Sequence, residues 1–413
     1  MAAIKPFQCI RPESKMAERV AALPYDVYNR KEAKQEVLRE PFSFLKIDRA
    51  ETQFPDEVDT YDPRVYEKAK ELLEDMLKQG VLLKDTQECY YIYQLTMAGR
   101  SQTGIVACAS IDDYLTNVIK KHENTREDKE IDRINHVDHC NAQTGPIFLA
   151  YRSQREIDQI VEQVKQGESL YHFMAVDGIG HLVWRISDRE LVERIRKAFQ
   201  AIESIYIADG HHRAASAVKV GLKRRREHPS YTGEEEFNYF LSVLFPHDQL
   251  MIMPYNRAVK DLNGLTQEEF LRRVGENFLI TAAAEEPFAP GRKTEFGMYL
   301  EGTWYSLQAK EALRKLTDPV RALDVSLLQD YLLQPILGIE DPRTDQRIDF
   351  IGGIRGLGEL ERRVEEDMKV AFSMYPTSIT ELFDVSDAGK LMPPKSTWFE
   401  PKLRSGLFIH SLE

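Results

Sequence analysis

Residues 205–217, IYIADGHHRAASA, constrain the fold of this chain more than any other segment. The apolar run predicts a buried strand over 204–208, and we expect a helix to begin near His211. Helical spacing places four small or apolar residues on one helix face: Ala214, Ala217, Val218 and Leu222. Because alanine has little bulk, this face can lie close to a sheet. The segment therefore predicts a tightly packed strand, turn and helix.

The turn inside this segment has residues that suit an anion. The first N–H groups of a helix have no partner within the helix, and they lie at the positive end of its dipole. Gly210 permits a positive φ or a close backbone approach, and Arg213 offers a forked donor for phosphate. His211 and His212 are adjacent, so one can contact a ligand while the other packs behind it. We expect phosphate or nucleotide binding at Gly210, His211 and Arg213.

Asp209 has two expected roles. An aspartate directly before a helix is a common N-cap, and a carboxylate at the end of a strand can also hold a divalent cation. Three interpretations of the turn therefore stay open. The first is a site that binds phosphate, the second is a capped helix with histidines in the core, and the third is a site for a metal alone.

The rest of the chain predicts a mixed α/β fold of the α+β type. Two β-rich stretches, 89–111 and 172–186, each contain a glycine turn and are expected to form hairpins. Residues 187–202 predict a helix, and residues 261–413 mix amphipathic helices with short strands. Hairpins interrupt the pattern, so no long alternation of strand and helix is expected.

Charge and cysteine content exclude several classes of protein. The net charge is −12 over 413 residues, so a nucleic-acid partner is not expected, and the basic run 223–226 is interpreted as a solvated helix end. The four cysteines have no zinc-ligand spacing and fit a reducing compartment. We expect neither a signal peptide nor a membrane-spanning segment, because residues 1–10 have no apolar core and no run approaches 18 apolar residues. We expect a cytoplasmic protein without a membrane partner.

The motif DGHHR after an apolar strand resembles the nucleotide-binding turn of ParB/sulfiredoxin-like proteins, and most closely that of the free-serine kinases, which carry D-G-H-x-R. The whole chain resembles the DUF1015 family, on stretches spread over nearly its full length: LPYDVYNR (23–30), KHENT (121–125), GPIFLAY (145–151), IADGHHRAASA (207–217), IMPYNRAVK (252–260) and MPPKSTWFEPKLRSG (392–406). The resemblance implies a ParB/sulfiredoxin-like core over 111–260, an N-terminal α/β module over 1–110 and a C-terminal α/β region over 261–413.

The resemblance also implies site residues. In the serine kinases a glutamate in a His-Glu element is the base, and the matching element here is His122-Glu123. Glu123 lies further from Asp209 than in those kinases, which an insertion containing the 172–186 hairpin would explain. A solvated glutamate in a charged cluster is the alternative. The catalytic set is then Glu123, Asp209 and His212, with ATP or ADP as cofactor and Mg²⁺ on Asp209.

Residues outside the motif are further candidates. Lys395, Ser396 and Thr397 combine a cation with two hydroxyl donors, which suits phosphate. The alternative there is a loop fixed by its prolines. Asp26, in a turn, and Arg257, at the end of a strand, are candidate substrate contacts.

These residues predict a phosphotransferase that acts between a nucleotide and a small hydroxylated metabolite, serine or O-phosphoserine by the resemblance. Phosphoryl transfer needs charge neutralisation, alignment and a base, and the motif offers each of them. Two alternatives are a ParB-like binding protein without catalysis and a metal-dependent phosphohydrolase. The oligomeric state cannot be inferred from these features.

Overall fold

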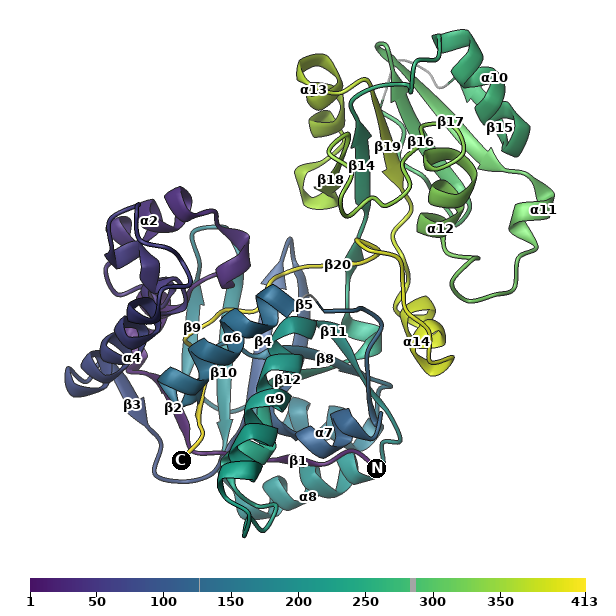
Figure 1. The fold of residues 1–413 in the computed structure, drawn as a ribbon. Coiled ribbons are helices and arrows are strands. Elements are labelled where there is room, and N and C mark those ends of the chain that lie inside the picture. The colour runs from purple at the N-terminus through teal and green to yellow at the C-terminus, as the bar shows by residue number, and fades with distance from the viewer. Residues whose placement is uncertain (126, 283–286) are drawn as a thin grey trace. The chain divides into compact units, whose positions relative to one another are not determined.

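The computed structural model describes residues 1–125, 127–282 and 287–413. The chain forms two compact units (Figure 1). Unit 1 contains residues 1–250 and 401–413, and unit 2 contains residues 251–400. Helices and sheets are present in both units, which confirms the mixed α/β class.

A nine-stranded sheet forms the centre of the described part of unit 1. Its strands run in the order β6-β11-β8-β12-β5-β4-β10-β9, and β1 pairs with β5. The strands are β1 (Ile4–Lys5), β4 (Tyr90–Met97), β5 (Arg100–Ser110), β6 (Ile119–Lys120), β8 (Ile147–Tyr151), β9 (Tyr171–Met174), β10 (Gly180–Ile186), β11 (Ile205–Asp209) and β12 (Tyr239–Pro246). A smaller sheet has the order β3-β2-β21-β7, from β2 (Cys9–Pro12), β3 (Leu82–Lys84), β7 (Ala142–Gln143) and β21 (Ile409–Ser411).

Helices of unit 1 bury the apolar face of the large sheet. Ala214, Ala217 and Val218 of α9 join this core, as the spacing predicted, and Leu222 packs at its margin. Ile157 of α7 and Phe199 of α8 belong to the same core. The helices of this unit are α1 (Ala17–Val20), α2 (Arg30–Arg39), α3 (Leu45–Asp48), α4 (Pro63–Lys78), α5 (Ile111–Leu115), α6 (Glu127–Cys140), α7 (Arg155–Lys165), α8 (Arg189–Gln200) and α9 (His211–Glu227), with the short turns η1 (Ser14–Met16), η2 (Tyr25–Val27), η3 (Ala50–Gln53), η4 (Glu236–Asn238) and η5 (His247–Gln249).

Asp209 lies on the opposite face of the sheet. Asp209 is paired with Phe148 across the sheet, so both side chains lie on this face. The C-terminal segment contacts the same face, because Phe408 packs on Tyr93 and Arg404 donates to His181. The end of the chain thus contributes to the surface on which Asp209 lies.

The two units differ from the boundaries expected at 110 and 260. Strands β1, β4 and β5 of the first expected module hydrogen-bond in one sheet with β8, β11 and β12 of the second. Segments that share a sheet belong to one compact unit, and both lie in unit 1. The hairpins expected over 89–111 and 172–186 are present as β4–β5 and β9–β10.

Unit 2 contains a six-stranded sheet in its described part, with the order β15-β17-β16-β19-β14-β18, and the small pair β13-β20. Its core includes Trp304 and Leu360. The strands are β13 (Ile252–Met253), β14 (Tyr255–Val259), β15 (Phe278–Ala282), β16 (Glu295–Leu300), β17 (Thr303–Ala309), β18 (Ile348–Gly352), β19 (Val370–Met374) and β20 (Trp398–Phe399). The helices are α10 (Gln267–Asn277), α11 (Glu311–Arg314), α12 (Asp324–Leu328), α13 (Gly358–Glu366) and α14 (Ile379–Asp387), with η6 (Gln329–Leu333) and η7 (Gly353–Arg355).

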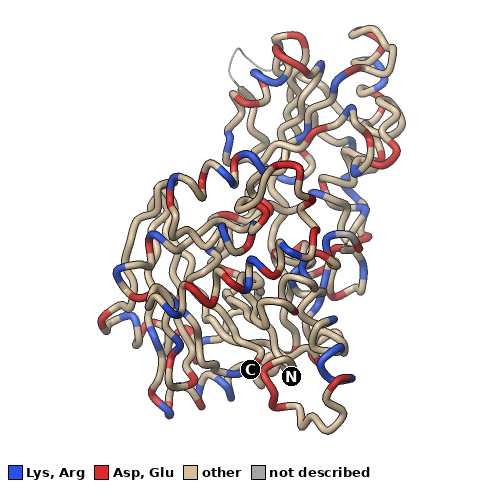
Figure 2. Tube along the Cα trace, turned by 60° about the vertical axis from the view of Figure 1, so that its left-hand side comes forward, with Lys and Arg blue, Asp and Glu red and all other residues tan. Residues whose placement is uncertain are grey.

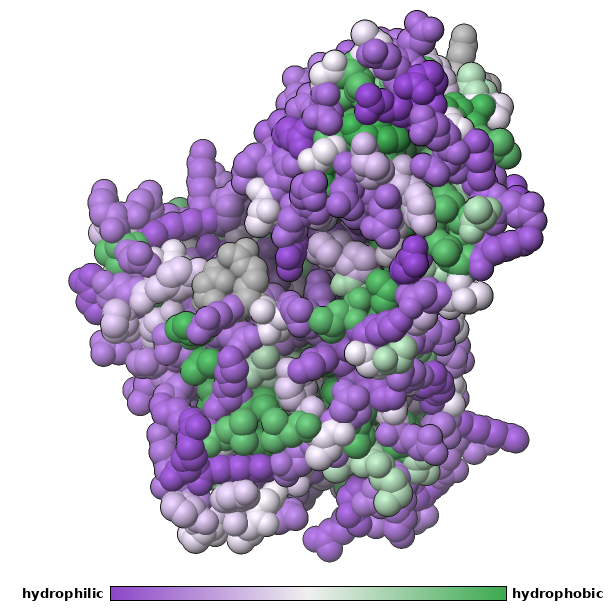
Figure 3. All heavy atoms as spheres, turned by 45° about the vertical axis from the view of Figure 1, so that its right-hand side comes forward, coloured by the Kyte–Doolittle hydropathy of each residue, from purple (hydrophilic) through white to green (hydrophobic). Residues whose placement is uncertain are grey.

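The surface is mostly hydrophilic on the face that Figure 3 shows, and its apolar areas are small and separated. Within the described residues, no helix has both the length and the apolar character that crossing a bilayer requires.

Candidate functional site

The turn between β11 and α9 is built around Gly210. Gly210 is the N-cap of α9 with φ 94°, and no side chain among the described residues caps this helix. The backbone angle favours glycine, and a Cβ at Gly210 would lie 3.1–3.2 Å from the guanidinium of Arg213, which would have to shift by a few tenths of an ångström. The expectation that Asp209 is the N-cap is wrong, because its side chain accepts only the nearer N–H of Gly210, at 2.8 Å.

The Asp209 carboxylate lies among cations. Lys402 Nζ lies 3.2 Å from Asp209 Oδ2. The side chain of Lys402 is 21% exposed, and that of Asp209 is 37% exposed. Burial opposes ionisation of Asp209, but the charges of Lys402 and Arg213 outweigh it and lower the pKa of the carboxyl well below its usual value. Asp209 is therefore ionised at neutral pH.

Lys402 was missed by sequence reasoning. It belongs to unit 1 although it lies in the C-terminal segment. It is also part of the stretch MPPKSTWFEPKLRSG, which supports the family resemblance. The Lys-Ser-Thr element of the same stretch favoured Lys395 as the phosphate contact, because only there does a lysine adjoin two hydroxyl side chains.

His211 forms a buried pair with His122. Their ring centroids are 4.5 Å apart with an interplanar angle of 86°. Burial lowers the pKa of His122 to about 4, and burial together with the neighbouring His122 lowers the pKa of His211 well below its usual value. Both rings are therefore neutral at pH 7. His122 Nδ1 and His211 Nε2 are buried without a hydrogen-bond partner among the described residues.

Glu123 lies beside His211, and its role as the base stays a prediction. Strand β6, just before it, pairs in parallel with β11, which ends in Asp209. Glu123 Oε2 is 3.4 Å from His211 Nδ1, and its side chain is 44% exposed. The segment between the two elements contains β8, α7 and α8 as well as the 172–186 hairpin, and the hypothesis that this hairpin lies in an insertion relative to the kinases stays a prediction.

A second ion pair holds the loop that carries Glu123. The Thr125 hydroxyl donates to the buried carboxylate of Glu130 on α6, and Lys219 of α9 donates to the same carboxylate. The Ser216 hydroxyl donates to the backbone oxygen of Glu130 at 3.1 Å. These contacts fix α6 against α9 and so position the loop of Glu123 beside His211. Sequence reasoning did not identify Glu130, because a glutamate in a charged run gives no distinguishing signal.

Arg213 connects the turn to the interior. Its Nη1 donates to the carbonyl oxygen of Pro146 at 2.6 Å, while the rest of the guanidinium lies under Gly210. His212 is half-buried in the first turn of α9, and its catalytic role stays a prediction. Asp26 is exposed on η2, next to Tyr25, also in unit 1.

The other predicted residues belong to unit 2. Lys395 is exposed, Ser396 is buried with its hydroxyl donating to the carbonyl of Pro393 at 2.6 Å, and Thr397 is half-buried. Arg257 is buried in β14 and donates to the carbonyl oxygens of Tyr255 and Lys395. Burial lowers the pKa of Arg257 to about 10. The present contacts hold the loop of unit 2 together, and a role of these four residues toward phosphate or substrate stays a prediction.

No group of three or more His, Cys, Asp or Glu side chains gathers as a metal site in the described part of the chain. A Mg²⁺ ion that accompanies phosphates commonly uses only one or two carboxylates, together with water and phosphate oxygens. Asp209 alone therefore fits such an ion, and the metal prediction is neither confirmed nor contradicted.

The basic run at the end of α9 is neutralised by acidic partners. Lys223 and Arg224 contact Asp138, and Arg225 contacts Asp112. Acidic and basic residues are interspersed along the chain, as Figure 2 shows. These three cations of the run are therefore engaged within the protein.

The fold and the site define a mixed α/β protein with a glycine turn at the start of a helix, flanked by a carboxylate, two cations and neutral histidines. The chain belongs to the DUF1015 family, described as "Protein of unknown function", whose model matches residues 4–326. This confirms the family resemblance. No curated protein matches the chain.

Solved structures similar to this chain include three that match it at low TM-scores. A free serine kinase mutant in complex with AMP is 15% identical with a TM-score of 0.36, over 74% of this chain and 92% of that chain. A free serine kinase mutant in complex with ADP is 16% identical with the same TM-score and coverage. A conserved hypothetical protein from Pyrococcus furiosus is 15% identical with a TM-score of 0.34, over 74% of this chain and 94% of that chain. At this level, the matches do not identify the activity of this chain.

Proposed function

We propose that this protein transfers a phosphoryl group between ATP or ADP and a small hydroxylated metabolite, with serine or O-phosphoserine as the substrate pair. One observation carries the proposal. The Asp209 carboxylate, the cations Lys402 and Arg213, and the Glu123–His211 pair meet at the start of a 17-residue helix that no described side chain caps. The likeness of the DGHHR motif to the free-serine kinases agrees with it.

The phosphate end of the nucleotide would bind at Gly210. The N–H groups of the first turn of α9 and the dipole of the helix attract negative charge. Arg213 and Lys402 add two positive charges beside them. The chain thus supplies the charge neutralisation that phosphoryl transfer requires.

Glu123 would accept the proton of the attacking hydroxyl. Its carboxylate is partly exposed, so a substrate can reach it, and neutral His211 can hold it in place through Nδ1. The hydroxyl oxygen forms the new bond to phosphorus, the bond to the leaving nucleotide oxygen breaks, and the proton passes to Glu123. In the reverse direction, Glu123 returns the proton.

Mg²⁺ would be held by Asp209 together with the phosphates of the nucleotide. When bound, the ion would neutralise charge on the phosphate oxygens. Asp209 is partly exposed and is a carboxylate at neutral pH, which is the form that coordinates Mg²⁺. In that state Lys402 would contact phosphate rather than Asp209.

The test follows both directions of transfer by phosphorus NMR. Purified protein with Mg²⁺ is given serine and ATP, or O-phosphoserine and ADP. We expect transfer in the wild type and a loss on the order of a hundredfold or more in Glu123→Gln and Asp209→Asn. Glu190→Gln, at an exposed glutamate of α8, is the matched control.

Two results would contradict the proposal. The first is the absence of transfer in both directions by correctly folded protein. The second is release of free phosphate without any nucleotide, which would favour the phosphohydrolase alternative.

A further inference from the structure

Arg257 is a buried cation of unit 2 without an acidic partner. It lies in β14, between β18 and β19, and is 3% exposed. Its Nη1 donates to the carbonyl oxygen of Tyr255, and its Nη2 donates to that of Lys395 at 3.0 Å. No carboxylate of the described residues lies within ion-pair distance of this guanidinium. It stays charged at pH 7, although burial lowers its pKa to about 10. A buried charge of this kind favours an anionic ligand.

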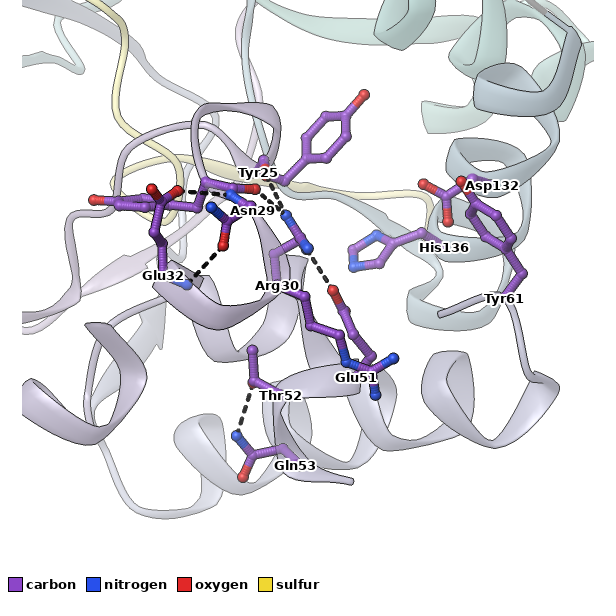
Figure 4. A network of polar contacts seen from close by, with 12 residues as sticks. Tyr25, Asn29, Arg30, Glu32, Glu51, Thr52, Gln53, Tyr61, Asp132 and His136 are labelled. Atoms are coloured by element: carbon purple, nitrogen blue, oxygen red, sulfur yellow. Dashed lines mark hydrogen bonds and ion pairs between the residues drawn. The ribbon is translucent and has the colours of Figure 1, made fainter. Parts of the chain in front are cut away.

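The other buried arginines show what Arg257 lacks. The described residues include three further buried arginines, and each has a carboxylate partner: Arg11 pairs with Asp85, Arg133 with Asp132 and Arg404 with Asp177. Half-buried Arg49 follows the same pattern, because it donates to the carboxylate of Glu51 as well as to the carbonyl oxygen of Tyr25 (Figure 4). Arg257 departs from this pattern, so its environment has room in its charge balance for an anion.

The turn over residues 393–397 is fixed through its carbonyl groups. The Thr377 hydroxyl donates to the carbonyl oxygen of Ser396 at 2.9 Å, and the Ser396 hydroxyl donates to that of Pro393 at 2.6 Å. The backbone N–H groups of Lys395 and Ser396 have no acceptor among the described residues. A fixed turn with neighbouring N–H groups of this kind is suited to an anion.

Lys395 adds a second positive charge at this turn. Its Nζ lies 5.6 Å from the ring centroid of Tyr255, and it forms no ion pair with a carboxylate of the described residues. Lys395 is exposed, so a ligand can reach it from solvent, whereas Arg257 lies buried against the carbonyl of the same residue. Thr397 is half-buried, and its hydroxyl has no partner in the described part of the chain. Two cations and several donors thus meet at one turn without an acidic residue.

We propose that this turn of unit 2 binds a phosphate group. The N–H groups of Lys395 and Ser396, the Lys395 ammonium and the Thr397 hydroxyl would donate to the phosphate oxygens. Arg257 would balance the charge from behind the turn. Several donors at one point suit phosphate, which has more acceptor oxygens than a carboxylate. The site contains no residue of the turn at Gly210, so the inference goes beyond the proposed transfer and does not depend on it.

The test follows backbone amide signals of the full chain by NMR, with ¹⁵N-labelled lysine, while inorganic phosphate is added. The Lys395 amide reports on the turn of unit 2, and the Lys402 amide reports on the surroundings of Asp209 in unit 1. Each signal is identified by its absence in Lys395→Gln or Lys402→Met. We expect the Lys395 signal to shift to saturation in the wild type and in Lys402→Met. Acetate at the same ionic strength should leave it unchanged.

Two variants test the groups around the turn through the same Lys395 signal. Thr397→Val keeps the shape of the side chain and removes one donor, so phosphate should bind about tenfold more weakly. Arg257→Met removes the buried charge and should weaken binding by about tenfold or more. Lys260→Gln, at an exposed lysine of unit 2, is the matched control and should bind phosphate as the wild type does. If Arg257→Met does not fold, Thr397→Val decides.

Two further titrations distinguish the source of the phosphate group. O-phosphoserine carries it on a small metabolite, and ADP carries it on a nucleotide. The compound that shifts the Lys395 signal at the lowest concentration, compared with inorganic phosphate, identifies the source.

Three outcomes would overturn the inference. The first is a Lys395 signal that none of the three phosphate compounds shifts, and the second is a shift with acetate equal to that with phosphate. The third is folded Thr397→Val and Arg257→Met protein that binds phosphate as the wild type does. Failure of the proposed function has a different signature, because the Lys395 signal then responds as expected while no phosphoryl transfer occurs.

Discussion

Lys402 Nζ lies 3.2 Å from Asp209 Oδ2, although 193 positions separate the two residues along the chain. The C-terminal segment makes this contact possible because it returns to unit 1 and is held there. Ser405 pairs with Ala22 through two backbone hydrogen bonds, and the buried Arg404 forms an ion pair with the exposed Asp177. The last residues of the chain thus complete the electrostatic environment of the motif.

Replacing Lys402 by methionine should reduce activity far more than stability. A partly exposed ion pair contributes about 0–1 kcal/mol to folding, so the melting temperature should change little. Loss of a cation beside the phosphates should lower transfer by on the order of a hundredfold. Thermal melts and phosphorus NMR provide the two measurements, and Lys84→Met, at an exposed lysine of β3, is the control. Full activity in Lys402→Met would remove Lys402 from the site.

Gly210→Ala separates a backbone effect from a local clash. Gly210 and Gly178 both have positive φ, 94° and 77°, and a Cβ meets Arg213 only at the first of them. Each alanine variant should lose about 1–2 kcal/mol of unfolding free energy. Only Gly210→Ala should also lose nucleotide affinity, because it displaces Arg213. Urea denaturation and nucleotide titration test this, and equal nucleotide affinity in both variants would contradict it.

Unit 1 should lose stability in mild acid because of His122. The pKa of this ring is about 4 in the folded protein and near 6.5 in an unfolded chain. Between these values only the unfolded chain binds the proton, so lowering the pH favours unfolding. The contribution is about 2 kcal/mol between pH 6.5 and 5.

His122→Gln should reduce this pH dependence. Hydrogen exchange of unit 1 peptides at pH 6.5 and 5 measures it. His172→Gln, at an exposed histidine of β9, should leave the dependence as in the wild type. An unchanged slope in His122→Gln would show that this ring is not the group responsible.

Unit 2 should respond to pH in the opposite direction through Asp324. Burial raises the pKa of this carboxyl to about 7, despite the N–H of Thr294 that it accepts. Between pH 4 and 7 the folded state binds a proton that the unfolded chain does not, so raising the pH lowers the free energy of unfolding. The loss is about 2–3 kcal/mol from pH 5 to 7.

Asp324→Asn keeps an acceptor for Thr294 and should flatten this dependence. Hydrogen exchange of unit 2 peptides is the measurement, and Asp384→Asn, at an exposed aspartate of α14, is the control. A slope that persists in Asp324→Asn would assign the effect to another group.

Local patterns predicted the elements around the motif correctly. The apolar run and the spaced alanines gave β11 and the packed face of α9, because both depend on neighbouring residues. The N-cap was predicted wrongly. Asp209 precedes the helix, but the positive φ of Gly210 moves the cap by one residue, and a sequence does not reveal that angle.

The sequence by itself determined the family, the strand, turn and helix around Gly210, and the types of charged residue available for an anion. Only the tertiary structure decided that Lys402 faces Asp209, that Glu123 lies beside His211, and that Lys395 and Arg257 belong to the other unit. The physical reason is that turns and helix faces follow from near neighbours in the chain. Partners brought together by strand pairing and by a returning terminus follow from the packing of the whole unit.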